Sequence, residues 1–350
     1  HTPAVNEIEK AVDTREEVKR TVKVERINSE QNALDKIMQA SHAGQCVCWI
    51  RNTVKSARQS YQDLLDAGIS PAQLSLFHSR FAMGDRQVVE NQTLDRFGNK
   101  STPEQRKGQV LIATQVVEQS LDLDFDLMIT DLAPIDLIIQ RAGRLQRHVR
   151  DVQGSRLTQK GVKDQRGLPL LMIFSPEPHE DVTEDWLKPD HAGTQAVYSH
   201  VGQLWLTAKL LLAKTENQFT MPEDARRLIE GVYSYEAENE IPFKLLEASF
   251  DAEAEGLVQR SMADFNELKL SKGYTYASGD WDEETRIPTR LTEQETVSVA
   301  LAVWEEGKLK PYITHQQYAW ALSTIKLPEY IWEKAQKAIP EKLEPFIEDL

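Results

Sequence analysis

The stretch that decides the fold runs from Val110 to His148 and reads VLIATQVVEQSLDLDFDLMITDLAPIDLIIQRAGRLQRH. It holds two short apolar runs, 110–113 and 127–130, which favour buried strands. A polar segment follows each run, and a helical pattern is predicted over 136–146. Because ligands of α/β sheets bind outside the carboxyl ends of parallel strands, we expect a binding site at this place.

Three arginines, Arg141, Arg144 and Arg147, recur at every third position towards the end of this stretch. Guanidinium groups so close together suit a polyanion such as the phosphates of a nucleotide. By itself, however, this spacing is more often that of a solvated or salt-bridged helix face. The arginine row alone therefore does not identify the ligand.

The wider block carries a family resemblance. QRAGRLQRH (140–148) resembles motif VI of superfamily-2 helicases, whose common form is QRxGRxGR, and ATQVVEQSLDLD (113–124) resembles their motif V. CWIRNT (48–53) resembles their motif IV. The motifs follow one another in the order of that superfamily, and motifs V and VI lie about the usual distance apart.

A further stretch narrows the resemblance. LFHSRFAMGDRQ (76–87), with TQVVEQSLD and the terminal RxH of motif VI, is similar to the CRISPR-associated helicase–nucleases recruited by type I Cascade complexes, subtype I-E above all. The motif-bearing similarity covers about residues 40–150. TRLTEQETVSVALA (289–302) more weakly resembles the start of that family's C-terminal domain.

Further apolar runs alternate with amphipathic helices, and this alternation predicts an α/β fold with a parallel sheet and helices on both faces. It is the pattern of a RecA-like domain. The additional strands are expected at 21–25, 46–50, 74–77 and 168–174.

We expect a helical region after the sheet and then a small α+β domain. The predicted layout is an N-terminal arm at 1–20, a second RecA-like helicase domain at 21–178, a helical linker region with one long helix at 179–275, and a C-terminal accessory domain at 276–350.

The charge of the chain is uneven. Residues 1–150 hold 20 Lys+Arg and 20 Asp+Glu, whereas residues 151–350 hold 21 and 35, so the net charge of −14 lies in the second part. An acidic surface disfavours broad electrostatic binding of nucleic acid. No apolar run approaches the length of a membrane span, and no secretory signal is evident, so we expect a cytoplasmic protein without a membrane partner. Cys46 and Cys48 are expected to be buried, reduced thiols.

The resemblance implies roles at the nucleotide. Arg144 and Arg147 match the arginine fingers of motif VI that reach the γ-phosphate. Gln140 and Arg141 match positions that contact the nucleotide and the partner domain. Asp122 matches the motif V acid that binds the ATP ribose, although a helix-capping role is the alternative.

The resemblance also implies contacts with nucleic acid. Thr114 matches the residue that bonds the backbone of the strand, while Thr53 is equally explained as a helix cap. Gln146 stands where the superfamily commonly has Gly, which affects the local turn and the reach of Arg147. His78 and Arg80 have a surface-loop role as their alternative. The implied nucleic-acid contacts are Arg51, Asn52, Thr53, His78, Arg80 and Thr114.

Several motifs of the complete motor do not occur in the chain: no GxxxxGK[ST] P-loop, no DExH or DEAD sequence and no His-Asp dipeptide. We therefore expect ATP and Mg²⁺ to be held mainly by a first RecA-like domain, and the divalent metal of an HD nuclease to lie outside this chain. No metal site is predicted within it. The chain alone is expected to be inactive.

The resemblance implies the C-terminal portion of an ATP-dependent single-stranded DNA translocase, coupled to an HD nuclease in CRISPR interference. Its expected partners are single-stranded DNA, the Cascade complex, and the first RecA-like and HD nuclease domains. Two alternatives remain: half of a DExH-type RNA helicase, and a non-catalytic RecA-fold docking or regulatory module. The indoles of Trp205, Trp304, Trp320 and Trp332 are predicted to pack in apolar cores rather than stack on bases.

Overall fold

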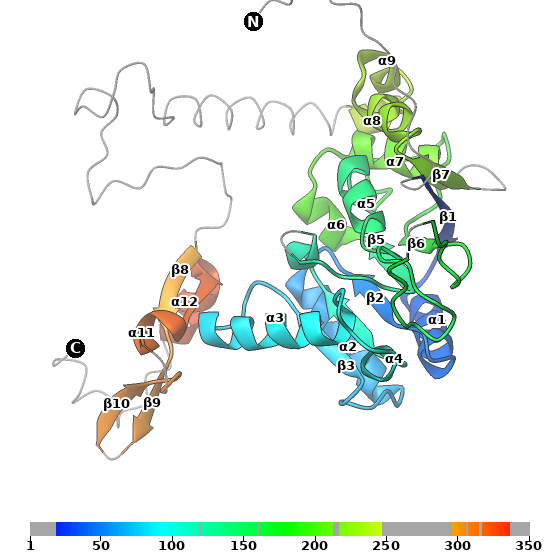
Figure 1. Ribbon diagram of the computed structural model, residues 1–350. Coiled ribbons are helices and arrows are strands. Elements are labelled where there is room, and N and C mark those ends of the chain that lie inside the picture. The colour runs from blue at the N-terminus through cyan, green and yellow to red at the C-terminus, as the bar shows by residue number, and fades with distance from the viewer. Residues whose placement is uncertain are drawn as a thin grey trace, which may run out of the picture. The chain divides into compact units, whose positions relative to one another are not determined.

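The computed structural model of the chain describes two compact units (Figure 1). One contains residues up to 76 together with 93–245, and the other contains 77–92 together with the part beyond 245. The described residues are 19–118, 121–159, 161–188, 190–212, 217–246, 296–305, 307–314 and 317–336. The predicted arm lies almost wholly outside these ranges, as does the predicted helical linker region beyond residue 246.

The first unit is built on a seven-stranded sheet in the order β3-β4-β2-β5-β6-β1-β7. The pairs β4–β2, β2–β5, β5–β6 and β6–β1 are parallel, and β7 alone is shown antiparallel, at the edge beside β1. The predicted α/β fold with a mainly parallel sheet is confirmed. The strands are β1 (Arg20–Ile27), β2 (Val47–Ile50), β3 (Leu74–Phe77), β4 (Val110–Ala113), β5 (Leu127–Asp131), β6 (Leu170–Phe174) and β7 (Gln218–Met221).

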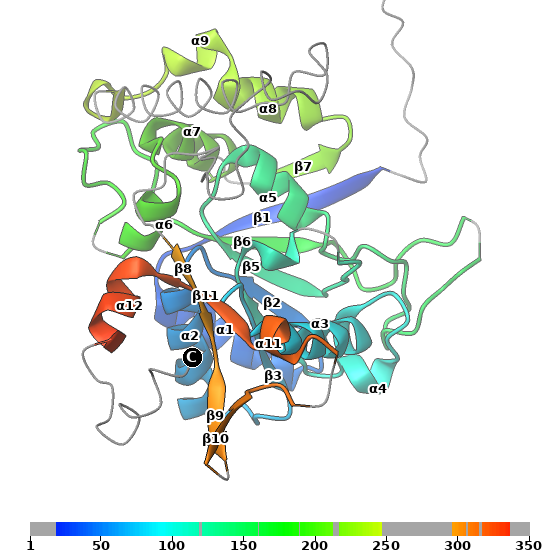
Figure 2. The same ribbon diagram turned by 90° about the vertical axis from the view of Figure 1, so that its left-hand side faces the viewer.

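Helices cover both faces of this sheet. Figure 2 shows α1 (Glu30–His42) and α2 (Val54–Asp66) on one side, and α5 (Ile135–Ala142) and α7 (Val201–Leu212) on the other. Both α1 and α2 begin at a hydroxyl residue whose side chain accepts a backbone N–H of the first turn. Such caps fix where each helix starts. The apolar faces of α1 and α2 then pack on the central strands. The chain between β3 and β4 adds α3 (Met83–Phe97) and α4 (Pro103–Arg106).

Helix α5 ends earlier than the sequence predicted. It stops at Ala142, and the N–H of Gly143 bonds the carbonyl of Ile139. The chain then turns back along the segment before β5, where the N–H of Phe125 bonds the carbonyl of Arg144 at 3.0 Å. The predicted helix to residue 146 is therefore wrong, because these strand-like bonds replace the last helical turn.

The region after β6 is less separate than the predicted boundary at 178 suggests. Strand β7 joins the main sheet, and α7 packs on β1. The predicted helical linker region begins with α6 (Ala192–Val197) and α7, which are separated by three non-helical residues. The remaining helices here are α8 (Ala225–Tyr233) and α9 (Tyr235–Glu238). Across the part of the chain that is described, no helix is long and apolar enough to cross a membrane.

The C-terminal part of the second unit consists of two small antiparallel pairs with short helices. Strands β8 (Thr296–Ala300) and β11 (Thr324–Pro328) form one pair, and β9 (Ala302–Glu305) and β10 (Lys308–Pro311) form the other. The helices are α11 (Ala319–Leu322) and α12 (Glu329–Gln336).

The tryptophan predictions divide between the two units. Trp205 is fully buried in the first unit, as predicted. Trp304 and Trp320 of the second unit are 39% and 45% exposed, so their predicted burial is wrong. Trp304 lies in a two-stranded sheet and Trp320 on the four-residue helix α11, and neither element has enough apolar surface to enclose an indole.

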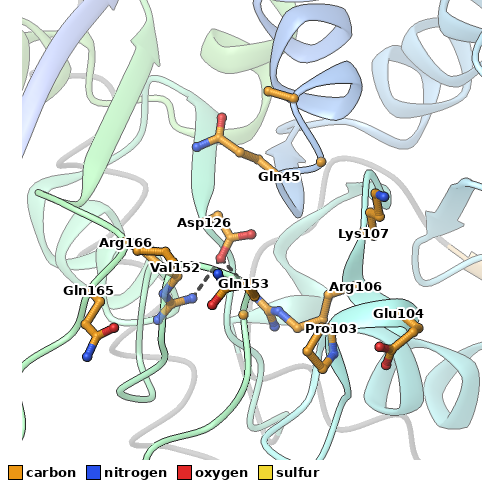
Figure 3. A pocket seen from close by; sticks show the side chains of 13 residues that line it. Gln45, Pro103, Glu104, Arg106, Lys107, Asp126, Val152, Gln153, Gln165 and Arg166 are labelled. Atoms are coloured by element: carbon orange, nitrogen blue, oxygen red, sulfur yellow. Dashed lines mark hydrogen bonds and ion pairs between the residues drawn. The ribbon is translucent and has the colours of Figure 1, made fainter.

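A cluster of buried charges closes the amino ends of the central strands. Asp124 is fully buried and takes hydrogen bonds from Arg150 and Arg166, and Arg106 donates to its backbone carbonyl at 2.8 Å. Figure 3 shows Asp126 between Arg106 and Arg166, bonded to both. The cluster ties the loop that carries Arg150 and Arg166 to the sheet, because each of these guanidiniums would be costly to bury unpaired.

We expect Asp124→Asn to lower the free energy of unfolding by about 3–5 kcal/mol, because three buried guanidiniums lose a shared counter-charge. Asp185→Asn is the matched control, since Asp185 forms an exposed pair with Lys188. That control should change stability by less than about 1 kcal/mol. Urea unfolding of both variants measures the difference, and equal effects would mean that the cluster is not a stabilising centre.

Candidate functional site

The predicted motif residues gather at the carboxyl ends of three neighbouring strands. β2, β4 and β5 end at Ile50, Ala113 and Asp131, and they lie side by side in the sheet. Motif IV follows β2 and motif V follows β4, and the side chain of Arg141 in motif VI reaches Thr130 near the end of β5. The parallel sheet therefore brings together segments that lie some 90 residues apart in sequence.

Arg141 lies at the centre of this arrangement and is 0% exposed. Its Nε donates to Glu118 Oε1 at 2.6 Å, and its Nη1 donates to Thr130 Oγ1 at 2.7 Å. Both terminal nitrogens also reach Asn52 Oδ1, at 3.3 and 3.4 Å. The guanidinium is used inside the protein and presents no free face. The geometry therefore does not fit the predicted nucleotide contact of Arg141, and it assigns this residue to holding motifs IV, V and VI together.

Arg51 is enclosed in a similar way. Its three nitrogens donate to Asp131 at 3.1 Å, Ser60 at 2.6 Å and Glu30 at 2.5 Å. The guanidinium also lies 4.4 Å from the centre of the Trp49 ring. With its side chain buried, Arg51 does not fit the predicted contact with nucleic acid, because its hydrogen-bond donors are already engaged.

The other residues of motif IV have local bonding roles. The Asn52 amide donates to the carbonyl of Leu132 at 2.7 Å, and the Asn52 side chain is buried. It too is turned away from the surface that was predicted to meet a strand. Thr53 is the N-cap of α2, where its hydroxyl accepts the N–H of Ser56 at 3.0 Å. The cap is thus present, and any contact of Thr53 with nucleic acid stays a prediction.

Motif V leaves β4 as a short turn of 3-10 helix, Gln115–Val117, which begins after the buried Thr114. The side chain of Thr114 forms no capping bond with this turn. Glu118 follows directly, with its carboxylate on Arg141 and its backbone carbonyl 2.9 Å from Arg144 Nη2. Glu118 therefore joins motif V to motif VI through two arginines.

The two predicted arginine fingers differ in their surroundings. Arg144 is half-buried and donates to the carbonyls of Val117 and Glu118. Burial and the neighbouring Arg147 lower the pKa of Arg144 from its usual value. Arg147 is exposed, and its Nε lies 2.8 Å from Asp122 Oδ1. Two guanidiniums that repel each other at a partly open surface are suited to a bound anion.

Asp122 serves as the counter-charge of this pair. Burial of its carboxyl acts to raise its pKa, but His148 and Arg147 outweigh burial, so the pKa lies below its usual value. His148 Nε2 contacts the same oxygen at 2.8 Å. Burial lowers the pKa of His148 despite this carboxylate, so at neutral pH the contact is a hydrogen bond and Arg147 supplies the charge. The side chains of Asp122 and Arg147 are 43% and 41% exposed and remain reachable.

The backbone conformation of Gln146 explains why the superfamily commonly has glycine at this position. It has a φ of 45°, a conformation in which glycine is the least strained residue. Its N–H bonds the carbonyl of Phe125 at 2.7 Å, so the turn is fixed by the strand-like pairing before β5. Its side chain is buried, and Oε1 has no hydrogen-bond partner within the described residues.

The remaining predicted residues are dispersed. Gln140 is exposed on the last turn of α5. His78 and Arg80 belong to the second compact unit, where His78 is buried, stacks on Phe81 at 4.3 Å and accepts the N–H of Arg80. The side chain of Arg80 is exposed.

Sequence reasoning did not single out two residues that complete the site: Glu118 and Tyr198. Glu118 carried a usable signal, since a lone acid beside an apolar turn in motif V has to find a partner once it is buried. Asp131 ends an apolar strand, and it holds the backbone N–H of Asn52 at 2.9 Å. Tyr198 gave no local signal, because its role depends on a fold contact with Arg141, 57 residues away.

A cavity of about 570 Å³ lies at the opposite edge of the sheet, away from these motifs. It is lined by residues that precede β2, β4 and β5, such as Gln45, Lys107 and Asp126 (Figure 3). Its arginines belong to the buried charge cluster. The cavity and the motif residues are therefore separate features of the first unit.

The chain is similar to proteins of one family. The family model described as "CRISPR-associated nuclease/helicase Cas3, C-terminal" matches residues 43–150. The CRISPR-associated endonuclease/helicase Cas3 of Escherichia coli is 32% identical over 200 residues, which is 57% of this chain and 20% of that protein. The Thermus thermophilus relative of the same name is 32% identical over 234 residues, 67% of this chain and 21% of that protein.

The fold is similar to a solved relative as well. The crystal structure of T. fusca Cas3 matches with a TM-score of 0.67 and 26% identity, over 91% of this chain and 37% of that one. These findings confirm the family resemblance: the chain carries a Cas3-like C-terminal domain. It spans about a fifth of the length of the two curated relatives.

We expect Arg141→Met to lower the free energy of unfolding by about 3–5 kcal/mol, because Glu118 is then left buried without its counter-charge. Arg147→Met, at an exposed ion pair, should cost less than about 1 kcal/mol. Urea unfolding of the two variants measures both values. A small effect at Arg141 would contradict its central structural role.

The turn at Gln146 gives a second test. Gln146→Gly and Gln146→Ala both remove the buried amide, but only glycine relieves the positive φ. We therefore expect the glycine variant to be more stable than the alanine variant by about 1 kcal/mol. Thermal and urea unfolding measure the difference, and an alanine variant of equal or greater stability would show that the turn is not strained.

Proposed function

We propose that this chain, which carries a Cas3-like C-terminal domain, is the C-terminal portion of an ATP-dependent single-stranded DNA translocase in CRISPR interference. It supplies the second RecA-like domain of the motor. In the complete machine it works with a first RecA-like domain and an HD nuclease. ATP and Mg²⁺ are held mainly by that first domain, and the divalent metal of the nuclease belongs to the HD domain. The Cascade complex is the proposed partner that recruits the machine, and the cytoplasm is its proposed location.

The observation that carries this proposal is the pair Arg144 and Arg147 beside Asp122, at a turn outside α5. Arg147 and Asp122 are each about two-fifths exposed, and Arg144 uses only two of its nitrogens on backbone carbonyls. These groups fit the charged parts of a nucleotide: guanidiniums suit phosphate oxygens, and a carboxylate suits ribose hydroxyls. ATP turnover supplies the free energy for movement along a strand.

The protein's own part in turnover is positioning. Bonds from Arg144 to motif V fix where its guanidinium lies, so a change in the motif V turn shifts a finger directly. Asp122 holds Arg147 by an ion pair, and a ribose hydroxyl that bound the Asp122 carboxylate would compete with it. We propose that Arg144 stabilises charge on the transferred phosphoryl group and that Arg147 assists it.

We propose fewer residues in contact with the DNA strand than the sequence alone implied. Thr53 and Thr114 stay candidates through the start of α2 and the start of the motif V turn, and Arg80 through its exposed guanidinium. Arg51 and Asn52 act indirectly, because both are buried and hold the edge on which a strand would lie. His78 has the same indirect role towards Arg80.

In the complete protein, we expect Arg144→Ala to reduce DNA-stimulated ATP hydrolysis by about a thousandfold or more, because an arginine finger neutralises charge only in the transition state. Thermal unfolding should change little. Arg226→Ala is the control, since Arg226 pairs with Glu230 on an exposed helix face. Turnover is measured with circular single-stranded DNA and with RNA of equal length. Retained turnover would refute the finger role, and stimulation by RNA alone would favour the RNA-helicase alternative.

A further inference from the structure

The segment 191–198 covers the carboxyl edge of the central strands. The His191 ring lies 4.2 Å from the ring of Phe174, at the end of β6. A Cβ at Gly193 would lie only 3.0 Å from Thr53 Cγ2, so the glycine allows this close approach. The Asn52 amide donates to Thr194 Oγ1 at 3.0 Å. Segment 191–198 therefore packs over motif IV.

Tyr198 ends the segment and brings its hydroxyl to the centre of the site. The oxygen accepts Arg141 Nη2 at 3.1 Å and Gln115 Nε2 at 3.5 Å. Gln115 Nε2 also donates to the carbonyl of Asn52 at 2.9 Å. The hydroxyl thus bonds Arg141 of motif VI and Gln115 of motif V directly, and it connects to Asn52 of motif IV through Gln115.

Towards Arg141 and Gln115 the Tyr198 hydroxyl acts only as a hydrogen-bond acceptor. An oxygen that accepts two N–H groups uses both of its lone pairs, so its own proton points away from Arg141 and Gln115. Burial raises the pKa of Tyr198, and the hydroxyl stays protonated at neutral pH. The positive charge of Arg141 strengthens the connected hydrogen bonds. Each bond is also electrostatically stronger than in water, because the dielectric constant of a buried network is low.

We propose that Tyr198 is a positioning residue whose hydroxyl locks motifs IV, V and VI into one arrangement. It acts through Arg141 and Gln115 and does not touch the reacting atoms. The motif V turn that Gln115 begins ends at Val117 and Glu118, the two residues whose carbonyls hold Arg144. The functional part of this inference rests on the proposed function, because it predicts that loss of the hydroxyl weakens the response of ATP turnover to a bound strand.

The first test concerns the lock itself and uses the 350-residue chain without ATP or DNA. Tyr198→Phe keeps the ring and removes only the hydroxyl. We expect amide hydrogen exchange of residues 115–118 to speed up about tenfold, as for loss of a hydrogen bond to a charged group. Tyr235→Phe is the matched control, since Tyr235 is 78% exposed on α9, and its exchange should equal that of the unchanged protein. Unchanged exchange in Tyr198→Phe would overturn the inference.

The second test separates positioning from packing in the complete protein. We expect Tyr198→Phe to lower the DNA-stimulated kcat and to raise the DNA concentration at half-saturation, each several-fold, and Tyr198→Ala to behave in the same way. A residue that served only to fill space would leave the Phe variant equal to the unchanged protein, and that result would also overturn the inference. If Arg144→Ala is inactive while Tyr198→Phe is normal, only the role of Tyr198 fails. If neither affects turnover, the proposed function fails, and the exchange experiment still decides the lock.

Discussion

A fully buried guanidinium at Arg141 is the interaction on which the rest of the site depends. Such a group is stable only if every donor finds an acceptor, and here the acceptors come from four places in the chain: Asn52, Glu118, Thr130 with Asp131, and Tyr198. Motifs IV, V and VI and the segment after β6 must therefore all be folded for any of them to be stable. This constraint turns three loops into one rigid edge.

Burial divides the arginines of the first unit into two kinds. Arg51, Arg141 and Arg150 are internal and hold the sheet edges, whereas Arg144 and Arg147 stay partly or largely exposed and keep donors for a ligand. The division follows from where α5 ends. If the helix had continued to residue 146, Arg144 would have lost its bonds to the motif V carbonyls. The strand-like pairing with Phe125 ends the helix and places Arg144 and Arg147 on the turn that follows.

Two clusters of charged side chains in the first unit differ in their exposure to solvent. At the amino ends, Asp124, Asp126 and Asp164 pair with Arg106, Arg150 and Arg166, so these charges are paired within the protein. On the turn after α5, Asp122 is shared between Arg147 and His148 at a surface that solvent reaches. The second arrangement leaves charged side chains partly exposed, whereas the charges of the first are largely buried.

The sequence by itself determined the α/β class, the order of motifs IV to VI and the family resemblance, because apolar strand patterns and short motifs are local properties of the chain. It also marked Gln146 as unusual, and the positive φ of that residue is the reason. Only the tertiary structure decided that Arg51, Asn52 and Arg141 face inward, that β7 joins the main sheet, and that Tyr198 closes the network. Whether a side chain is buried depends on partners up to 142 residues away, as between Asn52 and Thr194, and no local pattern encodes that distance.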